Sequence, residues 1–254
     1  MTDKVRAIFS KPDSMKDTPM HFCPGCHHGI LHRLVGEAID ALNVKESTIG
    51  VASVGCSVFL YNYFDVDILE APHGRAPAEA TAIKRVQPDK TVFIYQGDGD
   101  LAAIGTAEII HAANRGENFT VIFVNNANYG MTGGQMAPTT LLGMKTSTSP
   151  YGRDFRREGY PMKMAELIAL LEGSAFVARG AVDKPANLNK TKKYIQKAFE
   201  TQKKGLGFSF VEVISACPTD WGVSPIEANK IIQDKMIPYY PLGIYKDKKI
   251  ADHL

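Results

Sequence analysis

The sequence predicts an α/β fold, a mostly parallel sheet with helices on both faces. The clearest evidence for this fold lies in the middle third of the sequence. Continuous apolar runs at 91–95 and 120–124 are typical of parallel strands that are buried on both faces. Between them, residues 101–114 repeat apolar side chains at the helical period, and Gly116 is placed to end that helix. A strand, a helix and a strand in this order form a βαβ unit, whose crossover is almost always right-handed.

The rest of the chain continues this alternation of strands and helices. We expect helices at 30–42, 76–86, 164–171 and 188–202 and strands at 175–179 and 208–215. The later strands extend the same sheet. Residues 1–20 form a polar N-terminal lead-in, and residues 21–254 form a single domain.

Composition excludes several classes of protein. The 254 residues include 29 Lys and Arg against 27 Asp and Glu, and 44% are hydrophobic, which is typical of a globular protein and not of a disordered one. A net charge of +2 argues against nucleic acid as the main partner. No apolar run reaches the ~18–20 residues that cross a bilayer, and residues 1–16 are polar, so we expect no membrane association and a cytoplasmic protein.

Two polar residues follow the ends of neighbouring predicted strands. Asp98 and Asn126 lie 28 positions apart, each just after one of these two strands. If the strands are parallel neighbours, both side chains project into the crevice at the carboxyl edge of the sheet, where such folds bind ligands. Their oxygens suit Mg²⁺, which takes its remaining ligands from water and substrate phosphates. Gly97 and Gly99 let the backbone approach those phosphates. Either motif alone is weak, because Gly-Asp-Gly also forms turns and Asn also caps helices.

The four cysteines need a role other than disulfide formation in a reducing compartment. Cys23-Pro24-Gly25-Cys26 alone fits half a zinc site, a redox dithiol or half an iron–sulfur site. A dithiol leaves Cys56 and Cys217 unexplained, and these two lie 161 residues apart, unlike the second knuckle of a zinc ribbon. Four thiolates of this kind fit a cluster that the whole fold closes, although zinc remains open.

Two weaker patterns have ordinary structural explanations. His27, His28 and His32 follow the first cysteine pair, and we expect them to face solvent or bond to backbone and not to bind metal. The lysines of residues 190–204 suit a solvated helix face better than a docking surface for an acidic protein.

An ordered set of motifs resembles a known family. Gly97-Asp98-Gly99-Asp100 followed by Asn125-Asn126 is the thiamine diphosphate (ThDP) signature. Together with the cysteines it is similar to the beta subunit of the 2-oxoacid:ferredoxin oxidoreductases. The further motifs that carry the resemblance are Gly55-Cys56-Ser57, His73-Gly74-Arg75, the run from Tyr129 to Gln135 and Cys217-Pro218-Thr219.

The resemblance implies a ThDP diphosphate-binding domain with two metal sites. Asp98, Asn126 and the carbonyl of Asn128 would hold Mg²⁺. One 4Fe–4S cluster would be bound by Cys23, Cys26, Cys56 and Cys217. The positions that match the ThDP-lining residues of the family are Gly55, Ser57, His73, Gly99, Asp100, Gly130 and Met131.

The family's chemistry is the oxidative decarboxylation of a 2-oxoacid with coenzyme A to acyl-CoA and CO₂. Electrons pass through the 4Fe–4S cluster to ferredoxin. Residues 131–140 look more like the 2-oxoisovalerate and 2-oxoglutarate branches than the pyruvate branch, and we favour 2-oxoisovalerate. A zinc-stabilised phosphate-binding module and a thiol–disulfide protein are the competing readings.

The resemblance also assigns part of the active site to a partner. The glutamate that activates ThDP would come from an alpha subunit with a pyrimidine-binding domain, and gamma and delta subunits would complete some assemblies. We therefore assign no catalytic acid or base to this chain. Glu79 and Glu108 lie on predicted helices near the site and are expected to be helix-surface or capping residues.

Overall fold

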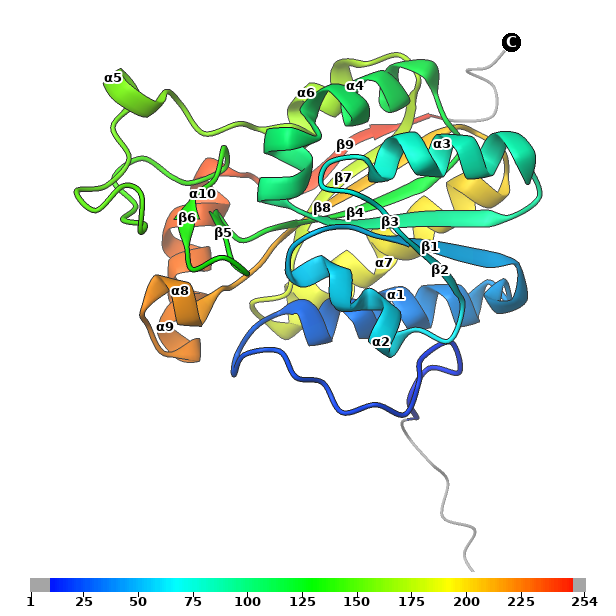
Figure 1. The fold of residues 1–254 in the computed structure, drawn as a ribbon, viewed down its shortest axis with the longest axis horizontal. Coiled ribbons are helices and arrows are strands. Elements are labelled where there is room, and N and C mark those ends of the chain that lie inside the picture. Colours follow the sequence, from blue (N-terminus) through cyan, green and yellow to red (C-terminus); the bar gives the residue numbers. More distant parts are fainter. Residues whose placement is uncertain (1–9, 249–254) are drawn as a thin grey trace, which may run out of the picture.

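The computed structural model describes residues 10–248, and its centre is a seven-stranded sheet (Figure 1). The strand order is β2-β1-β3-β4-β8-β7-β9, and every neighbouring pair is parallel except β7 with β9. The strands are β1 (Thr48–Ala52), β2 (Asp67–Glu70), β3 (Thr91–Gly97), β4 (Thr120–Asn125), β7 (Ser174–Ala181), β8 (Phe208–Ile214) and β9 (Gly243–Asp247). The predicted mostly parallel sheet is confirmed.

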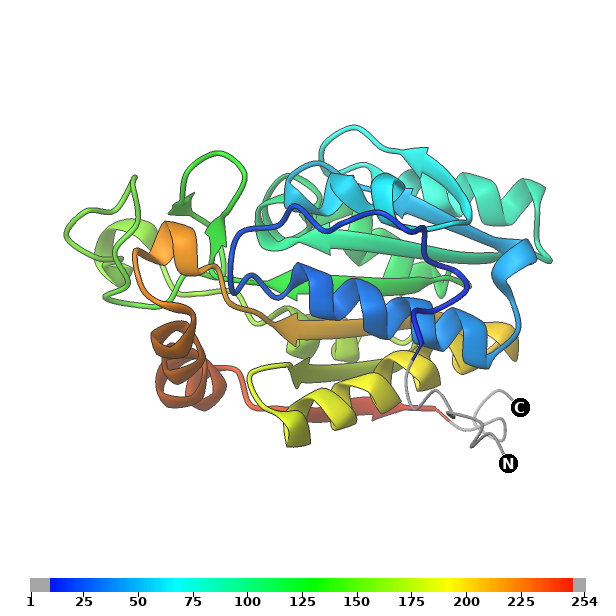
Figure 2. The same cartoon turned by 90° about the horizontal axis from the view of Figure 1, so that it is seen from below.

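Helices cover both faces of the sheet, as Figures 1 and 2 show. One face carries α1 (His28–Ala41) and α7 (Pro185–Lys203), and the other carries α3 (Ala76–Val86), α4 (Thr106–Arg115) and α6 (Met164–Leu170). The predicted helices are thus confirmed, apart from shifts at their ends and the division of the crossover helix described below.

Alternate residues of β4 pack into two different cores. Ile122 and Val124 lie in the core under α1 and α7, whereas Val121 and Phe123 lie in the core with α3 and α4. Because both faces of the strand are covered, its sequence reads as one uninterrupted apolar run. This is the physical reason that the sequence located the central strands so clearly.

The crossover from β3 to β4 differs from the single helix predicted at 101–114. Asp100–Ile104 form one π-helical turn (η3), in which the N–H of Gly105 donates to the carbonyl of Asp100 at 2.9 Å, and α4 begins only at Thr106. The turn buries Leu101 and Ala102 but leaves Ile104 48% exposed, and a single turn of five residues is too short for a periodicity to distinguish it from an α-helical turn. Wide turns of this type are frequent at functional sites.

Both central strands are longer than the sequence indicated. β3 ends at Gly97 and β4 at Asn125, so Asp98 and Asn126 each follow their strand directly. Gly97 pairs with Val124 in the parallel register, which brings the two strand ends to the same edge of the sheet. The βαβ unit therefore presents Asp98 and Asn126 at one edge, as predicted.

Several short elements lacked a detectable sequence signal. They surround the carboxyl edge of the sheet or connect the main elements, and each is too short to show a period. They are η1 (Lys45–Ser47), η2 (Cys56–Phe59), α2 (Leu60–Tyr63), β5 (Asn128–Tyr129), β6 (Gln135–Met136), α5 (Phe155–Glu158), α8 (Pro218–Trp221), α9 (Pro225–Ile231), η4 (Ile232–Met236) and α10 (Ile237–Tyr239). The edge strands β2 and β9 were likewise not predicted.

Part of the N-terminal lead-in packs on the chain itself. Met15 is buried and forms an isolated bridge with Phe64, and the hydroxyl of Ser14 donates to the carbonyl of Gly36 at 3.1 Å. Figure 2 shows this segment running beside α1. Residues 1–9 of the predicted lead-in lie outside the described residues.

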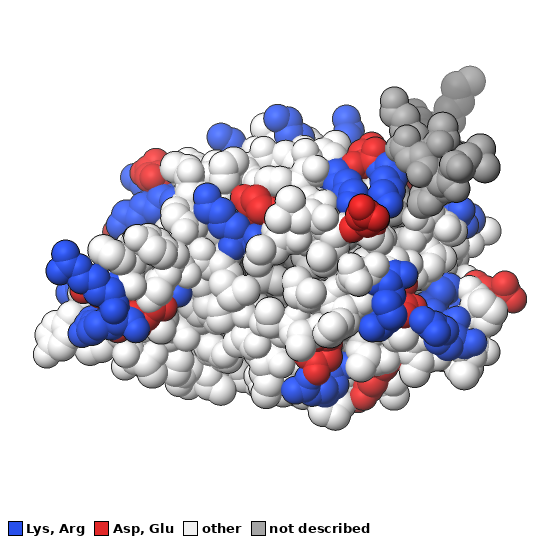
Figure 3. Space-filling view, turned by 90° about the horizontal axis from the view of Figure 1, so that it is seen from above, with Lys and Arg blue, Asp and Glu red and all other residues white. Residues whose placement is uncertain are grey.

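Charges of both signs are spread over the surface. On the face seen in Figure 3, basic and acidic side chains alternate around a broad uncharged area. Within residues 10–248, no helix combines the length and the apolar character needed to cross a membrane.

Candidate cofactor and metal site

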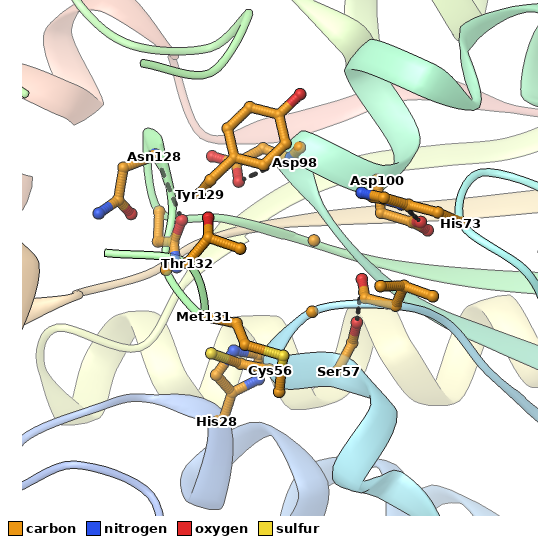
Figure 4. A pocket seen from close by; sticks show the side chains of 16 residues that line it. His28, Cys56, Ser57, His73, Asp98, Asp100, Asn128, Tyr129, Met131 and Thr132 are labelled. Atoms are coloured by element: carbon orange, nitrogen blue, oxygen red, sulfur yellow. Dashed lines mark hydrogen bonds and ion pairs between the residues drawn. The ribbon is translucent and has the colours of Figure 1, made fainter. Parts of the chain in front are cut away.

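The residues singled out in the sequence meet in one pocket at the carboxyl edge of the sheet (Figure 4). In the view of Figure 4, Asp98 and Asn128 lie at one end and His28 and Cys56 at the other. All ten residues expected to contact Mg²⁺ or ThDP line this pocket: Gly55, Ser57, His73, Asp98, Gly99, Asp100, Asn126, Asn128, Gly130 and Met131. The pocket therefore joins the ThDP motifs to one of the four cysteines.

Asp98 is a buried carboxylate at the end of β3, with only 2% of its surface exposed. Its Oδ1 accepts the N–H of Gly99 at 3.0 Å, and its Oδ2 accepts the hydroxyl of Thr139 at 2.8 Å. Burial raises the pKa of this carboxyl to about 7. A cation beside the carboxylate would offset the desolvation that causes this shift.

The backbone turns sharply after β4. Ala127 has a φ of 60°, in the left-handed region that alanine rarely adopts. The side-chain oxygen of Asn125 accepts the N–H of Ala127 at 3.2 Å, and the amide of Asn125 donates to Glu212 at 2.7 Å. Asn125 therefore holds the turn that brings Asn126 and Asn128 back toward Asp98.

The polar atoms of Asp98, Asn126 and Asn128 converge on one place. One terminal atom of the Asn126 amide lies 3.2 Å from Oδ1 of Asp98 and 2.8 Å from the carbonyl oxygen of Asn128. When this atom is the amide nitrogen, it donates to both oxygens. When the Asn126 amide is rotated by 180°, the atom at this place is the amide oxygen, and three oxygens face one another. In an octahedron with ligands at about 2.0–2.1 Å, adjacent oxygens lie about 3 Å apart. These three residues therefore fit a magnesium ion.

Asp100 lines the pocket, but hydrogen bonds already use both of its carboxylate oxygens. Oδ1 accepts the N–H of Gly74 at 2.7 Å and also pairs with His73. Oδ2 accepts from the hydroxyl of Ser53 and the amide of Gln96. Asp100 thus ties three segments together and shapes the wall of the pocket.

Two glycines let the backbone form part of this wall. Gly55 has a φ of 109°, which glycine adopts readily and other residues avoid. A side-chain carbon at Gly99 would lie 2.3 Å from ring atoms of Tyr129, closer than any real contact. Both positions therefore require glycine, and the resulting wall of backbone is suited to close contact with a diphosphate.

The four cysteines come from separate parts of the chain and gather beside the pocket. The N–H of Cys26 donates to the carbonyl of Cys23 at 3.0 Å, which closes the Cys-Pro-Gly-Cys turn. Burial, and then the neighbouring Cys26, Cys23 and Asp220, raises the pKa of Cys56 to about 11. The thiol of Cys217 donates to Asp220 at 3.2 Å. Asp220 also raises the pKa of Cys26, so it lies close to three of the four thiols.

These thiols do not have the environment of a reactive dithiol. Reactive Cys-x-x-Cys pairs have a lowered pKa, whereas burial raises the pKa of Cys26 to about 11. A zinc ion needs its sulfur ligands about 2.3 Å from one point. Within residues 10–248, no three His, Cys, Asp or Glu side chains are arranged so that they could hold a metal ion. The cysteines thus share a region without converging on one point.

The three histidines were expected to face solvent or to bond to backbone, and none of them faces solvent, since His27, His28 and His32 are at most 4% exposed. His27 accepts the N–H of Ala216 at 3.2 Å, so for this residue the backbone-bonded alternative is right, while His28 bonds to the hydroxyl of Tyr95 at 2.8 Å. Burial lowers the pKa of His28 to about 4, so its ring is neutral. His27 lies at the N-terminus of α1, and His28 and His32 lie on its buried side, four residues apart.

Three residues that the sequence did not single out contact the site. They are Thr139, which donates to Asp98, and the neighbours Asp220 and Trp221 on α8. The indole N–H of Trp221 donates to the carbonyl of Asn126 at 3.1 Å, and the amide of Asn128 donates to Asp220 at 3.1 Å. These contacts span from 41 to 95 residues of sequence, so local patterns cannot reveal them.

Comparison with known proteins agrees with this geometry. Residues 53–213 match the family described as "Thiamine pyrophosphate enzyme, C-terminal TPP binding domain", thiamine pyrophosphate being ThDP. The chain is 46% identical over 246 residues to ketoisovalerate oxidoreductase subunit VorA of Methanothermobacter marburgensis, covering 97% of this chain and 52% of the relative. It is 43% identical over 236 residues to 2-oxoglutarate synthase subunit KorB of Methanocaldococcus jannaschii, covering 92% and 83%.

A solved structure has the same fold. The 2-oxoglutarate:ferredoxin oxidoreductase of Magnetococcus marinus superposes with a TM-score of 0.79 at 24% identity, covering 97% of this chain and 87% of that one. The chain spans about half the length of the VorA relatives that it matches. It belongs to the thiamine pyrophosphate enzymes and, within them, to the subunits of 2-oxoacid oxidoreductases that carry the TPP-binding domain.

Proposed function

We propose that this chain is the beta subunit of a 2-oxoacid:ferredoxin oxidoreductase and supplies the diphosphate half of the ThDP site together with a 4Fe–4S site. The observation that carries the proposal is the single pocket that Asp98, Asn126 and Asn128 share with Cys56. The relatives named above are subunits of enzymes whose names specify 2-oxoacids. The shared fold with a solved 2-oxoacid oxidoreductase and the ThDP and cysteine motifs support the same proposal.

Mg²⁺ and the diphosphate would be held at the sheet edge. The Asn126 amide lies 3.2 Å from Oδ1 of Asp98 and 2.8 Å from the carbonyl oxygen of Asn128, so these three residues would supply oxygen ligands, and water and diphosphate would supply the others. The backbone at Gly55 and Gly99 would lie against the phosphates. When bound, ThDP supplies the electron sink for decarboxylation of the oxoacid.

Cys23, Cys26, Cys56 and Cys217 would hold the 4Fe–4S cluster. Three of the four thiols, those of Cys26, Cys56 and Cys217, lie near Asp220, which supports a shared site, and the raised pKa of Cys26 argues against a reactive dithiol. Cys56 also lines the proposed ThDP pocket, so a cluster held by these cysteines would supply one-electron redox chemistry beside that pocket.

The activating glutamate would come from the alpha subunit. No glutamate lines the pocket within residues 10–248, and Glu79 and Glu108 both lie outside it. Glu108 pairs with Arg75, and burial raises the pKa of Glu79. We expect the purified single chain to be inactive with 2-oxoacids and the complex with the alpha subunit to be active. Full turnover by the single chain would contradict this arrangement.

We favour 2-oxoisovalerate as the substrate, with 2-oxoglutarate and pyruvate as the alternatives. Residues 131–140 and the 46% identity to a ketoisovalerate oxidoreductase subunit support this order. The test is coenzyme A-dependent reduction of a dye by the anaerobic complex with each of the three oxoacids. A higher kcat/KM for 2-oxoisovalerate is the expected result, and a preference for either alternative would overturn the substrate assignment.

The metal role of Asp98 can be tested separately. The Asp98→Ala complex should lose ThDP and Mg²⁺ on gel filtration while it keeps its iron. The matched control is Asp67→Ala, which removes an exposed carboxylate from the edge strand β2. If Asp98→Ala retained as much ThDP as the control, the proposed role of Asp98 in binding Mg²⁺ would be wrong.

A further inference from the structure

A second cavity lies next to the turn at Ala127 and is separate from the pocket described above. Its volume is about 660 Å³, within the range of about 300–1,000 Å³ that is typical of small-molecule sites. Its walls come from the loop at 141–145 and from α8, α9, η4 and α10, and Figures 1 and 2 show these segments at the same end of the molecule. The motifs of the ThDP and cysteine sites do not line it.

Two aromatic rings form part of the walls, and the polar atom of each ring is already bonded. Trp221 lines the cavity while its indole N–H donates to the carbonyl of Asn126 at 3.1 Å. The hydroxyl of Tyr239 donates to the carbonyl of Pro161 at 3.2 Å, and its ring packs edge-on against Tyr240. Rings held in this way offer their apolar surface to another flat group.

The loop that completes the walls is fixed from behind. The N–H of Gly143 donates to the carbonyl of Arg153 at 2.9 Å, and the N–H of Arg153 donates to the carbonyl of Met144 at 3.1 Å. Leu141 is buried at the base of this loop and adds apolar surface to the cavity. The cavity is therefore preformed, and a ligand would not have to order its walls on binding.

Two lysines give the cavity a positive charge. Lys145 from the loop and Lys235 from η4 line it, and no acidic side chain among the described residues does. Within residues 10–248, neither ammonium group forms an ion pair or a hydrogen bond. Lysine binds phosphate groups as a point charge. Uncommitted cations beside aromatic rings thus suit a ligand that combines a flat ring with negative charge.

We propose that this cavity binds a nucleotide, with its base against Trp221 and Tyr239 and its phosphates at Lys145 and Lys235. Nucleotides combine a flat ring with phosphate charges, and a preformed cavity of this volume favours a small molecule over a peptide segment. Coenzyme A and a free adenine nucleotide share this chemistry. The nucleotide site itself goes beyond the proposed function, and only the choice of coenzyme A as its source rests on that function.

The chain carries its own reporter for this cavity, because Trp221 is its only tryptophan. The test follows the fluorescence of Trp221 while the full chain is titrated with coenzyme A, with ADP and with pantetheine, which lacks the nucleotide. Lys145→Met and Lys235→Met each remove one charge and keep a side chain of similar shape. Lys190→Met, at an exposed lysine on α7, is the matched control.

We expect coenzyme A, ADP or both to change the fluorescence saturably, and pantetheine to leave it unchanged. Each cavity variant should raise the Kd by about 10-fold, the usual effect of losing one charge-assisted contact, while the control binds like the wild type. Both lysines are exposed, so these variants should keep the thermal midpoint of the control. Tighter binding of coenzyme A than of ADP would identify coenzyme A as the source of the nucleotide, and the reverse would identify a free nucleotide.

The proposal is overturned if neither coenzyme A nor ADP binds, if pantetheine binds as tightly as coenzyme A, or if both cavity variants bind like the control. Equilibrium dialysis repeats the comparison with the complex of this chain and its partner subunits. If the cavity variants and the control bind equally there, a partner segment covers the cavity and the nucleotide proposal is wrong.

The Asp98→Ala variant keeps this inference separate from the proposed function. If it loses ThDP while the cavity binds no nucleotide, only the inference about the cavity is wrong. If it retains ThDP like its own control while the cavity binds a nucleotide, the proposed magnesium role fails and the nucleotide site stands.

Discussion

Asp98 is a carboxylate placed where water cannot stabilise its charge. It is almost fully buried, and its two oxygens accept hydrogen bonds from Gly99 and Thr139. These bonds lower the pKa, but burial dominates and raises it to about 7. In the metal-free protein the residue therefore binds a proton near neutral pH, and at the proposed site Mg²⁺ would displace that proton.

Mg²⁺ affinity should depend on pH for this reason. The pKa of Asp98 is raised from its usual 3.8 to about 7, so between these values the folded state holds a proton that the unfolded state releases. This group's contribution to the stability of the metal-free protein therefore falls as the pH rises toward 7. We expect the affinity for Mg²⁺ to increase from about pH 6 to about pH 7 and then level off. Calorimetric titration checks this, and a wild-type affinity that is flat over the same range would contradict it.

Thr139 should matter for metal binding although it binds no metal in this scheme. Its hydroxyl donates to Oδ2 of Asp98 at 2.8 Å and thereby leaves Oδ1 facing Asn126. Thr139→Val has nearly the same shape but no donor, and we expect it to raise the Kd for Mg²⁺ by about 10- to 100-fold. Thr139→Ser keeps the hydroxyl and should stay close to the wild type. Equal affinities for the Val and Ser variants would argue against this role.

Residues at strand ends could be found from the sequence, whereas residues on distant loops could not. Asp98 and Asn126 were located because a βαβ unit fixes where its two strands end. Thr139 and Asp220 reach the site only after a loop and a four-residue helix pack against it, and their own neighbours in sequence carry no signal of that packing. The contact of Trp221 with the site could not be predicted from the sequence for the same reason.

At the scale of elements, the segment from 137 to 160 is held by one buried arginine. Arg153 is 6% exposed, and its guanidinium donates to six backbone carbonyls, including those of Pro138 at 2.9 Å and Thr140 at 2.7 Å. The other four are those of Ala137, Glu158, Gly159 and Tyr160. Arg153 thus holds the backbone of this loop through side-chain hydrogen bonds. Two of its acceptors, the carbonyls of Pro138 and Thr140, flank Thr139 and fix its position.

Removal of this guanidinium should loosen the loop. In Arg153→Met the buried carbonyls lose their donor, at a cost of about 1–3 kcal/mol for each one that water does not reach. We expect faster hydrogen exchange of amides in residues 137–160 and a weaker Mg²⁺ site. The matched control is Arg157→Met, since Arg157 is exposed and pairs with Glu158 at 3.3 Å. Unchanged exchange in Arg153→Met would show that the loop is held in another way.

The elements predicted best are those buried on both faces. β3 and β4 were found because each of their residues packs on a helix layer, and α7 because it is long enough to show its period. The π-helical turn at Asp100–Ile104 was missed because a single turn of five residues is too short to be distinguished from an α-helical turn by its period. The histidines of α1 were misjudged because their burial depends on rings from other segments, such as Phe22 and Tyr63.

At the scale of the whole molecule, a buried ion pair links the sheet to the site. Arg179 on β7 and Glu212 on β8 are both fully buried and lie 2.9 Å apart. Glu212 also accepts from Asn125, which holds the turn at Ala127. The interior of the sheet therefore supports the magnesium turn through three side chains.

Breaking this pair should destabilise the protein strongly. Arg179→Met leaves Glu212 as an unpaired buried charge, and we expect a loss of about 3–5 kcal/mol in the free energy of unfolding. Arg179→Met combined with Glu212→Gln should recover part of this loss, because the unpaired charge is gone. Arg85→Met, which removes an exposed guanidinium from Glu117, is the control and should change little, because Glu117 keeps its pair with Arg115 at 2.8 Å. Urea-induced unfolding measures all of these, and equal stability of Arg179→Met and the control would contradict the assignment.

We propose that the molecule as a whole supplies half of an active site. The residues proposed for Mg²⁺ and the diphosphate line one pocket together with Cys56, and no glutamate from residues 10–248 lines it. A partner subunit would then complete the site.

The most direct test of this arrangement is the metal content of the anaerobically purified complex. We expect brown protein with about four irons and four sulfides for each copy of this chain, in addition to any clusters of the partner subunits, and loss of this set in Cys56→Ser. ThDP should be present at one per copy. Colourless protein with stoichiometric zinc, or an iron content that Cys56→Ser leaves unchanged, would contradict the assignment of the four cysteines.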